Sequence, residues 1–491
     1  MFESLLKRLV CLRSSPVVLS ALLLSACAVG PNYQAPAISL ESAYARQGET
    51  GLTARVPEAD VQFWRNWGDP FLEGLVADTL RANHDIRIAL SRYEQARALT
   101  YQAELDRYPT PSASGELSHQ RVSASQASGL SRTQRDGDSH QLSLAAVWEL
   151  DFFGRVRRSI ESKKADTEAY AADLAGVQVA VVAEVIDAYF RLRGLQERLR
   201  VARDNESNQA DTLRLIHVLF QEGRGTSLDV DRAGAQLALT RSRVPALQAQ
   251  AEVTANRIAV LTGRQPAVMA NELDRPVVLP IISVQVNAGV PGQLLRRRPD
   301  IAAAERRLAG ATARIGVATA DLFPRFTLGG LIGTQALGVN ALFQRDSETR
   351  LISLGVGGSF LDVARVRSRI AAANLEAAQS LEMYQQTVLA AMEEAENALL
   401  RLTHTQTEQS FLEQAVQASR RAASTARLRF EDGMVSVLEV LEAERVRLDA
   451  EERLAQSTTE QARALVGIYK TLAGGWPQLL PDLQQGAIAQ R

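Results

Sequence analysis

The chain has 491 residues, of which 46% are hydrophobic but only 5% aromatic, so its packing surfaces must be aliphatic and largely alanine. Lysine plus arginine (55) and aspartate plus glutamate (56) leave a formal net charge of −1, which excludes the globally basic surface typical of nucleic-acid-binding proteins. The only cysteines are Cys11 and Cys27, and the 5 histidines form no metal-ligand motif. Because no acid/base, nucleophile, metal or cofactor constellation is recognisable, we predict no enzyme, no metal site and no cofactor.

The first 26 residues are predicted to be a lipoprotein signal peptide. Basic residues precede an apolar run over 16–26, which suits a signal peptide and is shorter than the roughly 20 residues needed to span a bilayer. The run ends in Leu24-Ser25-Ala26-Cys27, which looks like a bacterial lipobox. We therefore expect cleavage before Cys27 and acylation of its side chain, which attaches the chain to a membrane. Ala28 in place of aspartate favours the outer membrane, and an ordinary signal peptide with an incidental cysteine is the alternative.

Beyond an extended, Pro/Ala/Ser/Gly-rich segment, the chain is an internal duplication. One set of residues matches its copy at an offset of 215 (300 − 85 = 215): Asp85, Asp106 and Pro109 with Asp300, Asp321 and Pro324. Further on the offset is 210 (430 − 220 = 210): Phe220, Gly223 and Leu228 match Phe430, Gly433 and Leu438. Insertions concentrate in loops, so we expect the length difference in the loops after Pro109 and before about Val156.

Two intervals, about 109–151 and 324–362, have the period-two alternation of β-strands. The alternating apolar positions are Leu142, Leu144, Ala146, Trp148 and Leu150, then Ile352, Leu354, Val356, Gly358 and Phe360. With a partner strand before each, we count about four strands per chain, each near the 9–11 residues of a membrane-spanning strand. A pair of soluble hairpins is the alternative, because strand signals of this type are weak.

Proline-free helical stretches run from Arg155 to Phe220 and from Val363 to Phe430, each about 100 Å long at 1.5 Å per residue. A heptad seam built largely from small residues follows each stretch at three- and four-residue steps and predicts closely packed coiled-coil helices. Its positions are Ala165, Ala169, Ala172, Gly176, Val179, Ala183, Ile186 and Phe190, then Tyr384, Val388, Ala391, Ala395, Ala398 and Leu402. Each long helix is expected to reverse at a glycine, Gly223 or Gly433, because a residue without Cβ readily takes the left-handed conformation. Helical hairpins of this length suit a rod or tube.

Four strands cannot close a barrel, and an open sheet edge in lipid leaves backbone groups unpaired. Several chains must therefore contribute if the strands insert in a membrane. Two chains give about eight strands, whose lumen is filled by side chains, whereas three give about twelve. The predicted fold is mainly α with a small β part: a long antiparallel coiled-coil α-helical barrel plus a transmembrane β-barrel, internally duplicated. The physics of the sequence prefers a trimer.

Five segments in order resemble the outer membrane factor (TolC-like) family of tripartite efflux systems, specifically the NodT-type lipoproteins. They are CAVGPNYQAP, FWRNWGDPFLEGL, LLRRRPDIAAAERRLAGATARIGVATADLFP, RFEDGMVSVLEVLEAER and LAGGW. The resemblance covers nearly the whole chain from Cys27 to Trp476. It implies a homotrimer with a β-barrel in outer-membrane lipid and a long helical tunnel in the periplasm. It also implies two partners, a periplasmic adaptor (membrane fusion) protein and an inner-membrane pump of the RND type that supplies the energy.

The expected organisation places two structural repeats between short flanking segments. Its parts are a signal peptide over 1–26, an acylated extended segment over 27–60, a first repeat over 61–264, an equatorial linker over 265–298, a second repeat over 299–476 and a C-terminal tail over 477–491.

The resemblance further implies a periplasmic gate just after the second helical reversal, where a leucine is followed by an acidic residue and an arginine. Here these are Leu438, Glu442 and Arg445, which share one helical face. In a trimer Leu438 would form an apolar ring, and Glu442 and Arg445 an ion-paired clasp. A solvated helical ion pair is the alternative. The first copy has Leu228, Arg232 and Ala235, so only the second hairpin is a good clasp candidate.

We therefore expect a passive, gated exit duct that carries drugs or other small toxic compounds from the periplasm to the exterior. One alternative is a duct for type I secretion of proteins or peptides. Another is a non-conducting periplasmic coiled-coil lipoprotein scaffold, which needs no lipid-facing strands.

Overall fold

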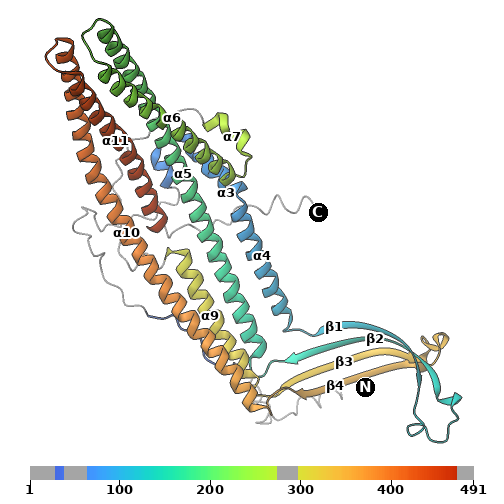
Figure 1. The fold of residues 1–491 in the computed structure, drawn as a ribbon. Helices are drawn as coiled ribbons and strands as arrows, with labels where there is room; N and C mark the ends of the chain where they lie inside the picture. Colours follow the sequence, from blue (N-terminus) through green and yellow to red (C-terminus); the bar gives the residue numbers. More distant parts are fainter. Residues whose placement is uncertain (1–27, 38–62, 274–296, 473–491) are drawn as a thin grey trace. The chain divides into compact units, whose positions relative to one another are not determined.

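The computed structural model of the chain describes residues 28–37, 63–273 and 297–472 (Figure 1). The predicted signal peptide, Cys27, the tail over 477–491 and most of the predicted linker over 265–298 lie outside the described residues. The chain divides into two units. A sheet unit comprises Met1–Ala37, Arg92–Ala171 and Ala303–Gln385, and a helix unit comprises Ile38–Ser91, Ala172–Ala302 and Gln386–Arg491.

Long helices and four strands dominate the described part of the chain. In chain order the helices and strands are η1 (Phe63–Trp67), α3 (Pro70–Ala82), α4 (His84–Leu105), β1 (Thr110–Arg121), η2 (Thr133–Arg135), β2 (Asp136–Leu150), α5 (Arg155–Gln221), α6 (Ser227–Leu261), α7 (Pro266–Leu273), α9 (Pro299–Ala320), β3 (Arg325–Ala336), η3 (Val339–Ala341), η4 (Arg345–Ser347), β4 (Glu348–Gly357), α10 (Val363–Glu431) and α11 (Val437–Leu472). The structure confirms the predicted mainly helical fold with a small β part.

The two repeats match element by element. Helices α4 and α9 both have 22 residues, and strands β1 and β3 both have 12, each pair at the offset of 215. Helices α6 and α11 begin at Ser227 and Val437, at the offset of 210. The change of offset therefore falls between β1 and α6, as predicted. It is not confined to loops, however, because β2 has 15 residues and β4 only 10.

The early end of β4 has a local cause. The sequence alternation continues to Phe360, but the strand ends at Gly357 because Gly358 adopts a left-handed φ of +127°. Asp362 then accepts a hydrogen bond from the backbone N–H of Arg365 (3.3 Å) at the start of α10. Asp151 does the same for α5, accepting from the N–H groups of Val156 (3.0 Å) and Arg157 (2.9 Å). Carboxylates at both helix starts satisfy free donors and favour a sharp strand-to-helix transition.

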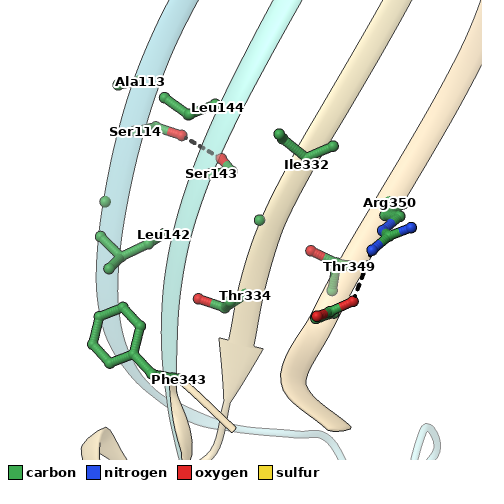
Figure 2. Close-up of a pocket in the computed structure, with 13 residues that line it drawn as sticks. Ala113, Ser114, Leu142, Ser143, Leu144, Ile332, Thr334, Phe343, Thr349 and Arg350 are labelled. Atoms are coloured by element: carbon green, nitrogen blue, oxygen red, sulfur yellow. Dashed lines mark hydrogen bonds and ion pairs between the residues drawn. The ribbon is translucent and has the colours of Figure 1, made fainter. Parts of the chain in front are cut away.

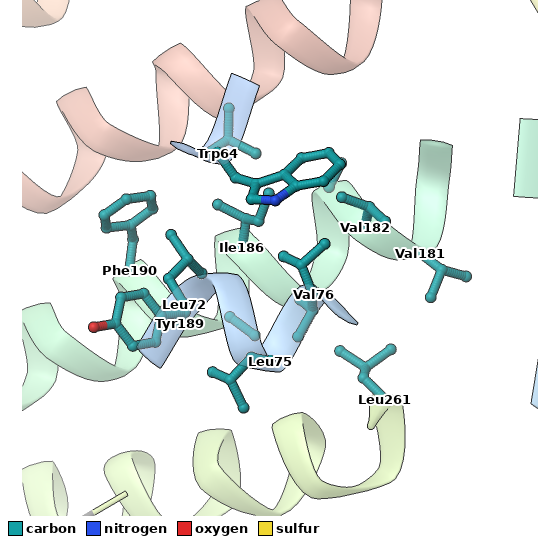
Figure 3. Close-up of a cluster of buried hydrophobic side chains, with 14 of the residues drawn as sticks. Trp64, Leu72, Leu75, Val76, Val181, Val182, Ile186, Tyr189, Phe190 and Leu261 are labelled. Carbon is teal, nitrogen blue, oxygen red and sulfur yellow. The ribbon is translucent and has the colours of Figure 1, made fainter. Parts of the chain in front are cut away.

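The core of the helix unit is built around the apolar middle of α5. This stretch is long and apolar enough to cross a membrane by composition, yet it packs inside the protein. Ile186 and Phe190 are fully buried, and Figure 3 shows them beside Leu72 of α3. Both belong to the predicted small-residue seam, in which Ala165, Ala169, Ala183, Val388, Ala391 and Ala395 are also buried. The stretch is therefore a protein core and not a lipid-facing span.

One polar contact sits inside this core. Asp69 caps α3 by accepting from the N–H groups of Phe71 (2.9 Å) and Leu72 (3.3 Å), and it also accepts from the hydroxyl of Tyr189 on α5. Burial, reinforced by this hydrogen bond, raises the pKa of Tyr189 to about 12. The Arg193 guanidinium lies over the Tyr189 ring at 4.9 Å from its centroid. The neutral phenol thus ties α3 to α5.

Both predicted helical reversals occur at the predicted glycines. Gly223 and Gly433 have φ values of +70° and +72°. Each reversal uses the same bonds: Arg224 donates to the carbonyl of Leu219, and Met434 to that of Arg429, both at 2.8 Å. This pattern closes the last helical turn around a left-handed glycine.

We predict that Gly433→Ala lowers the free energy of unfolding of the purified protein by about 1–2 kcal/mol, because alanine is strained at positive φ. Gly234→Ala is the matched control: Gly234 lies inside α6, its φ is not left-handed, and an added Cβ would meet nothing within 4 Å. This control should be neutral or slightly stabilising. Denaturant titration in detergent measures both, and equal stability of the two variants would contradict the prediction.

Candidate functional site

The four strands form one antiparallel sheet in the order β1-β2-β3-β4 (Figure 1). Registers such as Ala113↔Leu144, Leu144↔Ile332 and Ile332↔Arg350 place even-numbered residues of β2, β3 and β4 on one face with odd-numbered residues of β1. This apolar face carries Pro111, Ala113, Leu117, Leu142, Leu144, Ala146, Trp148, Phe326, Leu328, Ile332, Ile352, Leu354 and Val356. The opposite face, here called the polar face, carries Ser112, Ser114, Glu116, Ser118, Gln120, Gln141, Ser143, Thr327, Gln335, Thr349 and Ser353, together with the apolar residues Ala145, Val147, Leu331 and Leu351.

The apolar face is uncovered in a single chain. Leu117 is 76% exposed and Ile352 86%, far more than a soluble core position tolerates. Leu142, Leu144 and Ile332 line a shallow hollow of about 780 Å³ (Figure 2). On the polar face the hydroxyls of Ser114 and Ser143 pair at 2.8 Å across β1 and β2. One face thus suits lipid and the other water, which is the alternation of a transmembrane barrel.

The two outer strands define the chemistry of the sheet edges. Strand β1 pairs with β2, and β4 pairs with β3, so each has one edge without a strand partner in the described part of the chain. Such edges expose rows of backbone N–H and C=O groups. Lipid offers no partner for these groups, so the sheet can enter a membrane only if further strands complete it.

A buried acid stabilises the end of the sheet next to the helices, a role that the match between the repeats did not predict. Asp321 is 7% exposed and forms ion pairs with Arg369 (2.9 Å) and with Arg325. It lies between the end of α9 and the start of β3, whereas Arg369 belongs to α10. The sequence signal was the match of Asp321 with Asp106, but spacing alone could not name the two arginines.

The predicted gate residues lie on the first turns of α11. Leu438 is 52% exposed, and the Arg445 guanidinium donates two hydrogen bonds to the Glu442 carboxylate, at 2.7 and 3.0 Å. The hydrogen bond from Arg445 lowers the pKa of Glu442. The pair is solvent-exposed and lies within one chain, so it adds little to that chain's stability. The structure brings Glu442 and Arg445 together and leaves Leu438 uncovered.

The first hairpin tip lacks the acid–arginine pair, since the equivalent positions are Arg232 and Ala235. A capping box joins Thr226 and Asp229: the Thr226 hydroxyl accepts from the Asp229 N–H, and the Asp229 carboxylate accepts from the Thr226 N–H, each at 3.2 Å. The sequence Thr-Ser-Leu-Asp carries the signature of this motif, which sequence reasoning missed. Leu228, the counterpart of Leu438, is 53% exposed. The predicted acylation site, Cys27, lies outside the described residues.

Comparison with known proteins identifies close relatives. The model of the family described as "Outer membrane efflux protein" matches residues 75–264 and 290–474, once per repeat. Nodulation protein T of Rhizobium leguminosarum bv. trifolii is 31% identical over 460 residues, which cover 93% of this chain and 96% of that protein. The pyoverdine export outer membrane protein OpmQ of Pseudomonas putida is 30% identical over 420 residues, covering 85% and 88%.

Solved structures agree with this result. The outer-membrane channel OprN is 38% identical with a TM-score of 0.83, and the match covers 92% of this chain and 100% of that one. The open state of the MtrE outer membrane channel of Neisseria gonorrhoeae is 25% identical with a TM-score of 0.79, covering 92% and 99%. The family model matches well over half of the chain, and the relatives match along nearly all of it. The chain therefore belongs to the outer membrane efflux protein family.

Proposed function

We propose that three copies of this chain form a gated, passive duct across the outer membrane and periplasm, through which a pump expels small toxic compounds. The amphipathic sheet with two open edges is the observation that supports a shared barrel. Its apolar face fits lipid, its polar face fits a water-filled lumen, and its edges require strands from other copies. Three copies give about twelve strands, enough for a lumen, whereas about eight would be filled by side chains.

Each strand of the sheet is directly followed or preceded in the chain by a long helix. β2 ends at Leu150 and α5 starts at Arg155, and β4 ends at Gly357 and α10 starts at Val363. Helices α4 and α9 lead into β1 and β3 in the same way. A barrel of strands would thus continue into a tube of helices, so that one duct can cross both the outer membrane and the periplasm. An RND-type inner-membrane pump, joined through a periplasmic adaptor, would supply the driving force.

The cargo class follows from the named relatives. They include proteins described as exporting pyoverdine, solvent, toluene and cations, all of them small. This range supports small compounds over polypeptides as the cargo of this chain. The uncovered apolar face of the sheet argues against a scaffold that never enters the bilayer.

The purified protein tests the duct directly. We expect a homotrimer by mass measurement in detergent and small, stable single-channel currents in a planar bilayer. The conductance should be small because the periplasmic end would be held closed. A monomer that never conducts would refute the duct and return the strands to soluble hairpins.

We predict that replacing Glu442 and Arg445 together with alanine raises single-channel conductance several-fold and increases uptake of large antibiotics by cells, because the clasp that closes the periplasmic end is lost. The matched control replaces Asp211 and Arg214, an exposed ion pair with the same three-residue spacing on α5. Those positions are not in the predicted clasp, so conductance should not change. Unchanged conductance in an assembled Glu442/Arg445 variant would rule out the clasp.

The same clasp should depend on pH in a defined direction. Because Arg445 lowers the pKa of Glu442, the closing interaction is present above the ordinary glutamate pKa and is lost as pH falls through the lowered value. Conductance should therefore stay flat from pH 7 to 5 and rise only below about pH 4. In Glu442→Gln the carboxylate is absent, so this acid-induced rise should disappear.

We predict that Cys27→Ser abolishes metabolic labelling by fatty acid, because Cys27 is the residue that carries the acyl chains, while export activity survives in part because the barrel still inserts. Cys11→Ser is the control, since that residue lies in the cleaved peptide, and its labelling should equal the wild type. Persistent labelling of Cys27→Ser would overturn the lipobox assignment.

A further inference from the structure

The short described segment Ala28–Tyr33, here called the strap, lies against the start of α5 and along α9. The backbone N–H of Val29 donates to the carbonyl of Phe153 at 3.2 Å, just before α5 begins. The strap then runs back along α9, meeting Gly316 first and Glu305 last. All of these residues belong to the sheet unit.

A buried arginine of α5 holds the backbone of the strap. The guanidinium of Arg158 donates to the carbonyls of Val29 (3.2 Å) and Gly30 (3.3 Å) and to the side-chain oxygen of Asn32 (2.7 Å). Its side chain is only 5% exposed, and it forms an ion pair with Glu161 at 2.7 Å. A guanidinium has five donors and is costly to bury without acceptors. The strap supplies three of the acceptors that satisfy Arg158.

Glycines make the contact close. Gly30 has φ +88°, and a Cβ there would lie 2.5 Å from the Cα of Gly316. Gly154 has φ +80°, and a Cβ there would lie 2.7 Å from the Cα of Ala28. A Cβ on Gly316 would also strike the side chain of Arg158, at 2.8 Å. Strap and helices therefore meet backbone to backbone, which only glycine at these positions allows.

Tyr33 fastens the other end of the strap. Its hydroxyl donates to the Glu305 carboxylate at 2.5 Å, and the Arg306 guanidinium lies 5.6 Å from the centre of its ring. Burial and the neighbouring Glu305 raise the pKa of Tyr33, so the phenol stays a neutral donor.

The duplication offers an internal comparison. Every residue that holds the strap has a different residue at the equivalent position of the other repeat: Arg158 and Ser368, Gly154 and Ala364 (offset 210), Glu305 and Leu90, Arg306 and Ser91, Gly316 and Tyr101 (offset 215). The surrounding elements are otherwise matched in length, so these changes are local. A general need of the fold would appear in both copies. These five residues, two from the first repeat and three from the second, instead serve the strap.

We propose that Gly154, Arg158, Glu305, Arg306 and Gly316 form a binding site for the strap that presents the lipid-bearing end of the chain at the junction of β2 and α5. This role rests on the proposed acylation of Cys27, which immediately precedes the strap. At the junction, Phe153 stacks on Phe323 with ring centroids 4.5 Å apart, and girdles of aromatic residues flank the apolar band of transmembrane barrels. Because α5 belongs to the first repeat and α9 to the second, the strap also ties the two repeats together.

Hydrogen exchange of the full-length protein in detergent tests the binding site. In Arg158→Ala the peptide covering residues 28–35 should exchange at least about tenfold faster, because the strap loses three hydrogen bonds. Arg365→Ala is the matched control: this exposed arginine starts α10 and pairs with Asp362, so strap exchange should equal the wild type. Unchanged strap exchange in Arg158→Ala would overturn the site.

Variants on the strap itself guard against misfolding of the helices. Asn32→Ala and Tyr33→Phe leave the residues of α5 and α9 unchanged, and each should speed hydrogen exchange of the strap. In the double variant, Asn32→Ala should add little to the effect of Arg158→Ala, because both changes remove the same hydrogen bond. Wild-type exchange in both strap variants would also refute the proposal. Cys27→Ser should keep the strap protected while losing the fatty-acid label, so failure of the acylation assignment is visible separately.

Insertion of Gly-Ser directly before Ala28 tests the positioning role. It moves the acylated residue away from the bound strap, so the fraction of assembled channel in membranes should fall, with labelling retained. The same insertion directly after Ala37 leaves the spacing between Cys27 and the strap unchanged, so this variant should assemble like the wild type. Equal assembly of the two insertions would show that the strap does not position the anchor.

Discussion

The requirement that every backbone N–H and C=O be paired in lipid governs the rest of this structure. A four-stranded sheet with one apolar face meets this requirement at its inner strands, which are paired on both sides. The edges of β1 and β4 leave the rest unmet. Additional copies of the chain can meet it by pairing β1 of one with β4 of the next. The sheet thereby makes oligomerisation a condition of insertion, and the apolar face, uncovered in one chain, becomes the outer wall.

Each of the two repeats contributes one pair of strands to this sheet. Strands β2 and β3 pair along Leu150↔Phe326 to His140↔Ala336, although a complete helical hairpin separates them in sequence. The central pairing of the sheet is therefore the pairing between the two repeats. Each repeat alone would present a two-stranded hairpin, which is marginal in water and has two open edges. Together they form the smallest unit in which each repeat covers one edge of the other.

Much of this architecture was predictable because it rests on period and on turn chemistry. The seam that includes Ala165, Ala169 and Ala183 predicted closely packed helices, and these residues are buried. The helix reversals were predictable at Gly223 and Gly433 because glycine tolerates the positive φ that both residues adopt. What could not be predicted depends on distant partners. Nothing in the sequence near Arg158 says that its acceptors lie about 130 residues earlier (158 − 29 = 129). The gate triplet was identified through family resemblance, and a single chain shows only that Glu442 and Arg445 reach each other.

The differences between the repeats carry the functional information, because whatever the fold itself needs is present twice. The helix reversals are duplicated down to their hydrogen bonds, so they serve the fold. The positions of Glu442 and Arg445 are occupied by Arg232 and Ala235 in the first copy. The position of Arg158 is occupied by Ser368 in the second copy. These departures fall at opposite ends of the long helices, one beside the hairpin turn and one beside the sheet. The present chain has specialised one helix start to hold its own N-terminal segment and one hairpin tip to carry an ion pair.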